Sequence, residues 1–395
     1  MMNLSRRDVL ASTAAVAASA VMPAAAAATA GSAADSLNGI AAAKGLRFGS
    51  CLGTGPSGAP PQPGTTDTRP NQFTDQSYRD LFVAQCGLLV PENELKWYAI
   101  RTSPEVFDFT RADKLAAFVQ DAGLLMRGHT LLWNRNRWMP PWTQTYDYGT
   151  RPGTEAARLL TEHIAKVAGR YPQIFSWDVV NETIDPKTGA MEDSIFTKHI
   201  GPEVIDIAFH AARQAAPHAQ LVYNDYMSWG PGNQKHRDGV SALLERLKKN
   251  NVPIDALGVQ GHIGPGASQS TPKMSADDEQ QWRKFLDHAT GLGLDLIVTE
   301  FDVGDQEMPP DIAARDAQVA DMARRYFDVM LSYPQLRYVM AWGIVDKYSW
   351  LQGWWPRKDG VEKRPNPYDD KYQPKALRAA IAAALQGAPN RNWLL

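Results

Sequence analysis

Two glutamates, Glu182 and Glu300, stand directly after apolar runs, in the segments WDVVNE and VTEFD. Two carboxyl groups can take different roles in one site when their surroundings keep one protonated and the other ionised. Such a pair on either side of one bond is typical of glycoside hydrolysis, where one group protonates the leaving oxygen. Because the two residues are far apart in the chain, this chemistry requires a fold that joins the ends of distant strands.

Other polar and aromatic side chains follow further apolar runs in the same way. Amide, lysine and histidine side chains suit sugar hydroxyls, and aromatic rings suit the C–H faces of sugars. One such residue alone is more often a packing or loop residue, but their recurrence after seven predicted strands indicates a common site. The segments concerned are PENELKW (91–97), GHTLLW (128–133), YNDY (223–226), GVQGH (258–262), and AWG (341–343) with DKYSW (346–350).

The elements that must position these residues alternate along the chain. Apolar residues at helical spacing predict helices around 115–122, 202–216, 243–247, 282–289 and 319–330, each followed by a short apolar run. Gly123 is expected to close the first helix, and Pro202 and Pro217 to open and end the second. With earlier apolar runs at 47–52, 86–90 and 175–180, the pattern predicts eight strands.

Eight such units in one chain predict an α/β fold, a single (β/α)8 TIM barrel with extended loops, over residues 45–388. Active sites of this fold form at the carboxyl ends of the strands, where the polar segments lie. A doubly wound open sheet is the alternative, although no G-x-G-x-x-G follows the first strand. The Gly/Pro-rich stretch 53–70 is interpreted as a long first loop.

The first 34 residues resemble a targeting segment rather than part of the folded domain. Ser5–Leu10 contains a twin arginine, followed by an Ala-rich segment that predicts a twin-arginine signal peptide and cleavage around 24–30. An uncleaved membrane anchor is the alternative. The expectation is therefore export through the twin-arginine machinery to the periplasm or the exterior, with a short linker at 35–44 and a tail at 389–395.

The composition limits the possible partners. The 395 residues carry 41 Lys+Arg against 43 Asp+Glu, and this near-neutral balance argues against bulk electrostatic binding of nucleic acid. Cys51 and Cys86, the two cysteines, are too few for a disulfide scaffold; separate buried thiols are preferred to a pair. We expect a mature protein without stable membrane association, and a monomer.

The segments quoted above, in this order, resemble glycoside hydrolase family 10, the endo-1,4-β-xylanases, over about residues 45–385. The resemblance implies a retaining mechanism, with Glu300 as nucleophile, Glu182 as acid and then base, and carboxyl groups ~5–5.5 Å apart. It implies a substrate that is xylan or a xylo-oligosaccharide. We expect no cofactor and no metal, because the sequence shows no ligand loop or ligand cluster.

The resemblance also assigns roles to the surrounding residues. Asn181 would bind the sugar 2-OH, and His262 and Asp302 would hold Glu300 in position. Tyr226 would stack on the leaving-group side. The remaining substrate-binding residues are Gln260, His129, Trp133 and Lys96 at the cleaved sugar, and Glu92, Asn93, Trp342 and Trp350 at that sugar and its non-reducing neighbour.

The chain departs from the family pattern after the motif GHTLLW. Asn134 stands where members often have His, and the following stretch 135–142 is about two residues longer than usual. Together with the long loop at 53–70, this extension lies on the expected substrate face. We therefore expect the loops to favour short oligosaccharides over polymeric xylan.

Several alternatives remain open from the sequence. The enzyme could act on another β-1,4-glycan, such as cellulose, or the barrel could bind sugar without catalysis. A metal-dependent hydrolase would need a ligand cluster beside His129 and His262. Lys96 could serve only to neutralise carboxylates, Asn224 and Asp225 could cap the next helix, and Asp346 could be structural. Trp138, Trp142, Trp354 and Trp355 are left unassigned between core and substrate platform.

Overall fold

The computed structural model describes residues 34–55, 70–266 and 271–392. The predicted signal peptide, apart from Ala34, lies outside these residues, so twin-arginine export stays a prediction. Most of the predicted long first loop also lies outside them. Among the described residues, no helix combines the length and apolar character that crossing a membrane would require.

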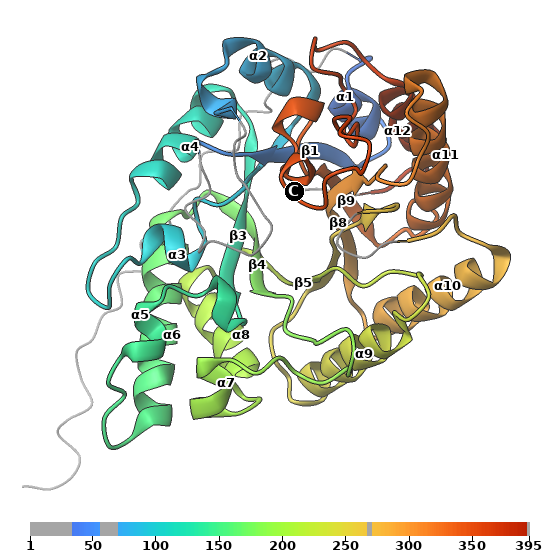
Figure 1. The fold of residues 1–395 in the computed structure, drawn as a ribbon. Helices are drawn as coiled ribbons and strands as arrows, with labels where there is room; N and C mark the ends of the chain where they lie inside the picture. Colours follow the sequence, from blue (N-terminus) through green and yellow to red (C-terminus); the bar gives the residue numbers. More distant parts are fainter. Residues whose placement is uncertain (1–33, 56–69, 267–270, 393–395) are drawn as a thin grey trace, which may run out of the picture.

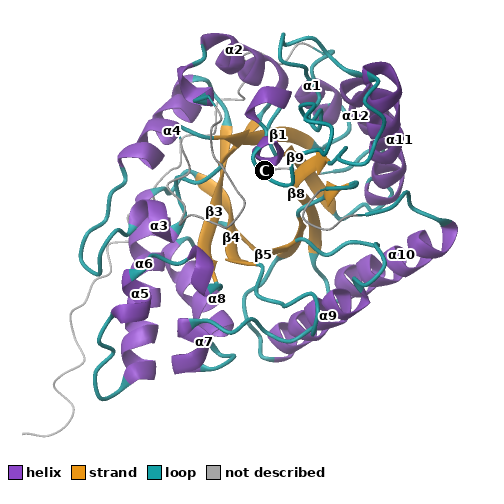
Figure 2. Ribbon diagram, in the orientation of Figure 1, coloured by secondary structure: helices purple, strands orange, loops and turns teal. Residues whose placement is uncertain are grey.

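The central element is a closed ring of parallel strands (Figure 2). Each strand pairs with its neighbours in chain order, and the ring closes where the first pairs with the last. A short further strand, β7 (His262–Ile263), pairs with the end of β8 outside the ring order. The predicted (β/α)8 barrel is confirmed. Its strands are β1 (Arg47–Leu52), β2 (Leu88–Pro91), β3 (Leu125–Trp133), β4 (Ile174–Asn181), β5 (Gln220–Asp225), β6 (Ala256–Val259), β8 (Asp295–Val303) and β9 (Leu336–Ala341).

Helices surround this ring on the outside (Figure 1). The five helices predicted from apolar periodicity are present as α4, α8, α9, α10 and α11, and Gly123 follows α4 with a φ of 65°. Pro202 does not open α8, because it lies in the turn before that helix. The helices are α1 (Leu37–Ala42), α2 (Gln76–Gln85), α3 (Trp97–Ile100), α4 (Thr110–Asp121), α5 (Trp142–Thr145), α6 (Pro152–Arg170), α7 (Ile195–Ile200), α8 (Val204–Ala215), α9 (Gln234–Lys249), α10 (Ala276–Gly291), α11 (Ile312–Met330) and α12 (Ala376–Gly387), with 3-10 turns at Gln72–Thr74, Asn136–Trp138, Asp346–Tyr348 and Trp350–Gln352.

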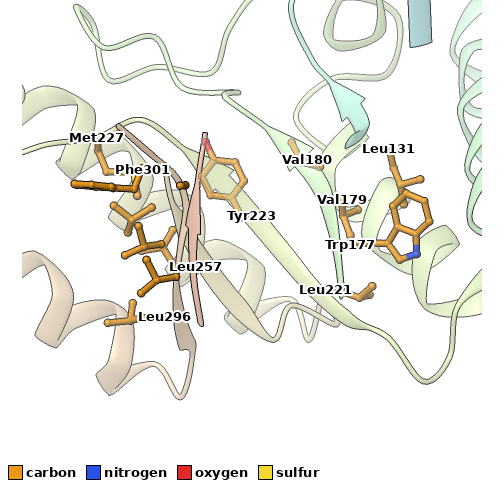
Figure 3. Packing of buried hydrophobic residues seen from close by; sticks show 14 of the residues in the cluster. Leu131, Trp177, Val179, Val180, Leu221, Tyr223, Met227, Leu257, Leu296 and Phe301 are labelled. Carbon is orange, nitrogen blue, oxygen red and sulfur yellow. The ribbon is translucent and has the colours of Figure 1, made fainter. Parts of the chain in front are cut away.

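The core has two layers because strand side chains alternate between the two faces of the sheet. Leu88 and Val90 belong to one buried cluster, whereas Leu89, between them, belongs to the other. In β8, Leu296 packs in the larger cluster and Ile297 in the smaller. Figure 3 shows part of the larger layer, which fills the space between barrel and helices. This packing fixes the strands whose ends carry the polar segments.

Both cysteines are buried, and they do not form a disulfide with each other. Cys51 lies within β1, whereas Cys86 caps the end of α2 just before β2. The preferred interpretation of two separate buried thiols is therefore confirmed.

Candidate active site

The strands bring the two glutamates to one level at the mouth of the barrel. The backbone N–H of Glu182 donates to Asn224 O at 2.9 Å, which continues the β4–β5 pairing by one residue. The N–H of Gln260 donates to Asp225 O at 3.0 Å, and that of Glu300 donates to Gln260 O at 2.8 Å. The residues that directly follow β4 and β6 are thus registered against the last residues of β5 and against β8.

A chain of side-chain hydrogen bonds connects the two carboxyl groups. Gln260 Nε2 donates to Glu182 Oε1 at 2.8 Å and lies 3.4 Å from Asn181 Oδ1. Asn224 Nδ2 donates both to Asn181 Oδ1, at 2.9 Å, and to Glu300 Oε1, at 2.7 Å. All five side chains are buried. The two glutamates therefore face one site across a network of amides.

Asn224 is a member of this site that the sequence-based set of substrate and catalytic residues lacked. It does not cap the next helix, because α9 begins at Gln234, so that hypothesis is wrong. Its Oδ1 accepts a hydrogen bond from Thr299 Oγ1 at 2.6 Å. A Cβ on Gly258 would lie 2.5 Å from the same oxygen, which explains why this strand position is glycine.

Asp225 likewise does not cap α9. Its Oδ1 accepts from the backbone of Tyr226 at 2.8 Å and pairs with His236 Nε2 at 3.1 Å. Asp225 therefore fixes the end of β5 against α9, beside the site.

Glu300 is surrounded by positive charge. His262 Nε2 lies 3.3 Å from Glu300 Oε2, and His262 Nδ1 lies 2.8 Å from Asp302 Oδ1. Burial alone would raise the pKa of Glu300, but the hydrogen bond from His262 and the charges of His129, His262 and Lys96 lower it. The carboxylate of Glu300 is therefore kept ionised, as a nucleophile requires.

We expect His262 to remain an imidazolium through neutral pH. Burial alone would lower its pKa, but Asp302 and Glu300 raise the pKa of His262 to about 10. Since an unfolded histidine titrates near pH ~6.5, the pair should stabilise the fold fully below that pH and lose this effect towards pH 10. An NMR titration of the His262 ring nitrogens checks this, and a ring that loses its proton near pH ~6.5 contradicts it.

Glu182 is held by different groups. Trp133 Nε1 donates to Glu182 Oε2 at 3.0 Å, while Gln260 binds the other oxygen. Arg135 Nη1 lies 3.6 Å from Oε2. The two glutamates thus have distinct environments, with the imidazolium of His262 beside Glu300 and an indole, an amide and a guanidinium beside Glu182.

Lys96 lies between the aromatic rings of the site. Its Nζ is 4.9 Å from the ring centroid of Trp133 and 5.9 Å from that of Trp342, and it donates to Asn93 Oδ1 at 3.1 Å. Burial lowers its pKa against the opposing effect of nearby carboxylates. The carboxylates concerned are those of Glu300, Glu92, Glu182 and Glu94. This position fits both a substrate-binding and a neutralising role.

His129 is fixed from the barrel interior. Its Nδ1 lies 2.9 Å from Asp178 Oδ2, and Asp178 Oδ1 accepts from Arg127 Nη2 at 2.6 Å. The ring of His129 meets that of Trp342 edge to face at 5.4 Å. Asp178 therefore holds His129 through Nδ1, and the charge of His129 acts on Glu300.

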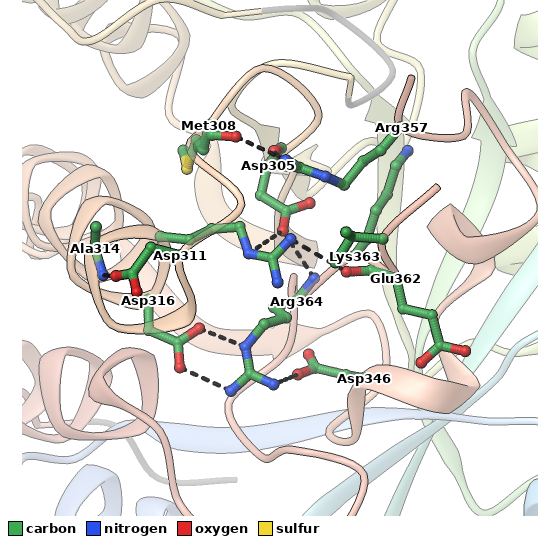
Figure 4. A network of polar contacts seen from close by, with 12 residues as sticks. Asp305, Met308, Asp311, Ala314, Asp316, Asp346, Arg357, Glu362, Lys363 and Arg364 are labelled. Carbon is green, nitrogen blue, oxygen red and sulfur yellow. Dashed lines mark hydrogen bonds and ion pairs between the residues drawn. The ribbon is translucent and has the colours of Figure 1, made fainter. Parts of the chain in front are cut away.

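Trp350 joins the loop after β9 to the catalytic strands. Its Nε1 donates to Asp302 Oδ2 at 2.7 Å, and its ring lies 5.0 Å from that of His262. A polar network fastens the rest of this loop (Figure 4). Arg364 binds both oxygens of Asp316 on α11 at 2.8 Å each.

Asp346 belongs to the same network through Arg364, whose Nη1 lies 3.8 Å from Asp346 Oδ2. The same oxygen lies 2.9 Å from Lys375 Nζ, and the side chains of Asp346 and Lys375 are buried. This contact favours the structural interpretation of Asp346. The network anchors the segment that carries Trp350 to the helical layer.

The extended stretch after β3 contributes an aromatic contact. Trp138 stacks on Trp133 with centroids 4.4 Å apart and an interplanar angle of 18°, and its ring lies 6.3 Å from that of Trp354. The loops after β3 and β9 therefore touch through aromatic rings beside the site. Trp142 instead donates its N–H to Arg101 O at 2.9 Å, in the packing of the loop.

The structure brings most of the predicted site residues together at the barrel mouth. Tyr226 is linked to Glu182 through Arg135, whose Nη2 donates to Tyr226 Oη at 3.0 Å. Arg135 was not among the predicted site residues, and Trp138 was left unassigned between core and substrate platform; both lie in the stretch that was noted as longer than usual. Among the described residues, no group of three or more His, Cys, Asp or Glu is placed to hold a metal ion.

The chain is similar to known proteins over most of its length. The family model for glycosyl hydrolase family 10 matches residues 59–384. Over 361 residues the chain is 31% identical to endo-1,4-beta-xylanase 5 of Pyricularia oryzae, covering 90% of this chain and 80% of that protein. It is 33% identical over 310 residues to a beta-1,4-xylanase of Dictyoglomus thermophilum, covering 75% and 82%.

Solved structures give the same fold. Xylanase 10B from Thermotoga maritima superposes with a TM-score of 0.74 at 26% identity, covering 89% of this chain and 98% of that one. Xylanase 10B from Thermotoga petrophila, solved in complex with xylobiose, also gives a TM-score of 0.74 at 26% identity, covering 89% and 97%.

Proposed function

The chain belongs to glycosyl hydrolase family 10, and from this premise we propose that it is a retaining endo-1,4-β-xylanase with Glu300 as nucleophile and Glu182 as acid/base. The observation that carries the assignment is the amide network that links these two carboxyl groups while an imidazolium touches only one of them. A sugar-binding barrel without catalysis has no need of two carboxyl groups in such different surroundings.

The proposed reaction has two steps. In the first, Glu300 bonds to the anomeric carbon, the glycosidic C–O bond breaks, and the proton of Glu182 moves to the leaving oxygen. In the second, Glu182 takes a proton from water, the water oxygen bonds to the same carbon, and Glu300 is released. Asn181 would bind the 2-OH, since its side chain lies between the two carboxyl groups in the network.

We propose xylose rather than glucose units as the substrate because of two indole rings. Trp342 is buried, and Trp350 is tied to Asp302 through its N–H. These rings have little freedom to make room for the C6 hydroxymethyl group that glucose carries and xylose lacks. The names of the xylanase relatives support the same choice.

We also propose a preference for short oligosaccharides. The contact of Trp138 with Trp354 joins the loops after β3 and β9 beside Lys96 and Trp133, where the sugars on the non-reducing side would lie. A long xylan chain must extend past this contact between the loops, whereas a short oligosaccharide occupies fewer positions beyond the cleaved bond.

A substrate panel tests these proposals. We expect activity on xylo-oligosaccharides and xylan to exceed that on carboxymethyl cellulose by roughly 10–100-fold, the effect of one poorly fitting group in a rigid site. Proton NMR of the fresh product should show the β-anomer first. Equal rates on xylan and short oligosaccharides contradict the length preference, and faster cleavage of cellulose contradicts the choice of xylose.

We place this activity in a monomer in the periplasm or outside the cell. The basis for the location, not for the monomer, is the twin-arginine segment Ser5–Leu10, and N-terminal sequencing of the exported protein tests the export.

A further inference from the structure

Arg135 is a buried cation in the extended stretch after β3, next to the acid/base candidate. Its Nε donates to Glu182 O at 2.8 Å, and its Nη2 donates to Ile184 O at 3.3 Å and to Tyr226 Oη at 3.0 Å. Nη2 also pairs with Glu192 Oε1 at 3.0 Å. One guanidinium therefore joins the loop after β3 to the ends of β4 and β5.

Most of these contacts fall on one short segment, residues 182–192, which begins with Glu182. A surface arginine would gain little from such contacts, but only 6% of Arg135 is exposed. Burial alone would lower the pKa of Arg135, but Glu182, Tyr226, Asp225 and Glu192 raise it, so its charge is permanent. A buried, permanently charged guanidinium with this many acceptors holds the backbone segments around it in one arrangement.

The backbone of Glu182 explains why this arrangement needs to be held. Glu182 has a φ of 51°, in the left-handed region, which is unfavourable for a residue with a side chain. The hydrogen bond from Arg135 Nε holds the carbonyl oxygen of this residue. Without it, the turn can relax and carry the carboxyl group away from Trp133 and Gln260.

The remaining amino group of Arg135 faces the carboxyl group itself. Nη1 lies 3.6 Å from Glu182 Oε2, too far for a hydrogen bond but close enough to attract a carboxylate. Other charged or titratable groups near Glu182 are Lys96, Tyr226 and Glu192. Among the described residues, Arg135 is the cation with a recorded contact to the carboxyl oxygens of Glu182.

We propose that Arg135 is a positioning residue for the acid/base, which locks the turn at Glu182 and stabilises its carboxylate when the proton has moved to the leaving oxygen. The proposal rests on the proposed function of Glu182. No bond is made or broken at Arg135; the proton passes from Glu182 to the leaving oxygen, and the guanidinium keeps its own protons throughout.

Two substrates that differ in their leaving group distinguish a positioning role of Arg135 from general damage to the fold. A 2,4-dinitrophenolate leaves without a proton, whereas a sugar alkoxide needs one. Arg135→Met should therefore lower kcat/KM on xylo-oligosaccharides by about 10–100-fold, the usual effect of a small misplacement. On a 2,4-dinitrophenyl β-xylobioside, kcat/KM should change less than about 3-fold. Arg135→Lys keeps the positive charge but loses the planar guanidinium with its several N–H donors. Its kcat/KM on the oligosaccharides should lie between those of wild type and Arg135→Met.

Arg137→Met is the matched control. Arg137 is two residues further on in the same loop, is exposed, and lies with its guanidinium carbon 5.1 Å from the ring centroid of Trp138. It should leave the ratio of the two substrates unchanged. Equal losses on both substrates in Arg135→Met, or no loss on either, would overturn the proposal.

A second measurement does not depend on activity. Amide hydrogen exchange in residues 182–194 should become faster in Arg135→Met and Arg135→Lys than in Arg137→Met. Unchanged exchange there overturns the positioning role. A wild-type protein inactive on both substrates instead counts against the proposed function, while the exchange experiment still decides whether Arg135 locks the turn.

Discussion

If Glu300 is the nucleophile, replacing it by Ala is expected to lower turnover of xylo-oligosaccharides by at least about 10⁴-fold, because the side chains that the described residues place around its carboxylate cannot take over this role. Asn224 and His262 would remain around the vacated position, and both are donors without nucleophilic oxygen. The measurement is kcat on a β-xylobioside and on xylotetraose, beside the wild-type protein.

The loss in Glu300→Ala must be separated from unfolding. Removing the carboxylate leaves the imidazolium of His262 with Asp302 as its remaining partner, so some loss of Tm is expected. Circular dichroism should nevertheless report a folded barrel. Glu279→Ala, at a carboxylate on α10 paired with Arg283 and Arg325, is a control that should keep wild-type kcat. Retained turnover in Glu300→Ala would refute the assignment.

The product formed with a small anion gives an independent check on the nucleophile. Azide can enter the space left by Glu300 and attack the anomeric carbon from that side. The expected product is an α-xylosyl azide, which NMR identifies from its anomeric signal. A β-xylosyl azide from this variant would place the nucleophile elsewhere.

Replacing Glu182 by Ala should give the second large effect, and it should depend on the leaving group. General acid catalysis contributes about 10²–10⁴-fold, so this loss is expected for xylo-oligosaccharides, whose leaving oxygen needs a proton. A 2,4-dinitrophenyl β-xylobioside should still react in the first step. Its turnover should then slow at hydrolysis, because no base activates water, and a burst of dinitrophenolate should appear.

The azide product distinguishes the two roles. In Glu182→Ala, azide takes the place of the activated water and attacks the glycosyl-enzyme, so the expected product is a β-xylosyl azide. The opposite anomers expected from the two variants make the assignment testable within one experiment. Equal losses of kcat/KM, which reports the first step, on good and poor leaving groups in Glu182→Ala would exclude an acid role for Glu182.

The fold, and the position of the two glutamates at the mouth of the barrel, could be predicted from the sequence. Strand and helix periodicity predicted the eight strands, and the position after each apolar run predicted which residues lie at the barrel mouth. This prediction succeeds because a residue directly after a parallel strand lies at the carboxyl end of the barrel, independently of the loop conformation. Glu182, Gln260 and Trp342 are placed in this way.

Only the tertiary structure decided which partner each of these side chains takes. Asn224 follows the same strand-end rule, but its choice between a helix cap and Glu300 depends on where α9 begins. Arg135 and Trp138 lie in a loop whose path no periodicity specifies, and their partners come from other strands and loops. Strand ends follow from local pattern, whereas contacts between loops follow from the packing of segments far apart in the chain.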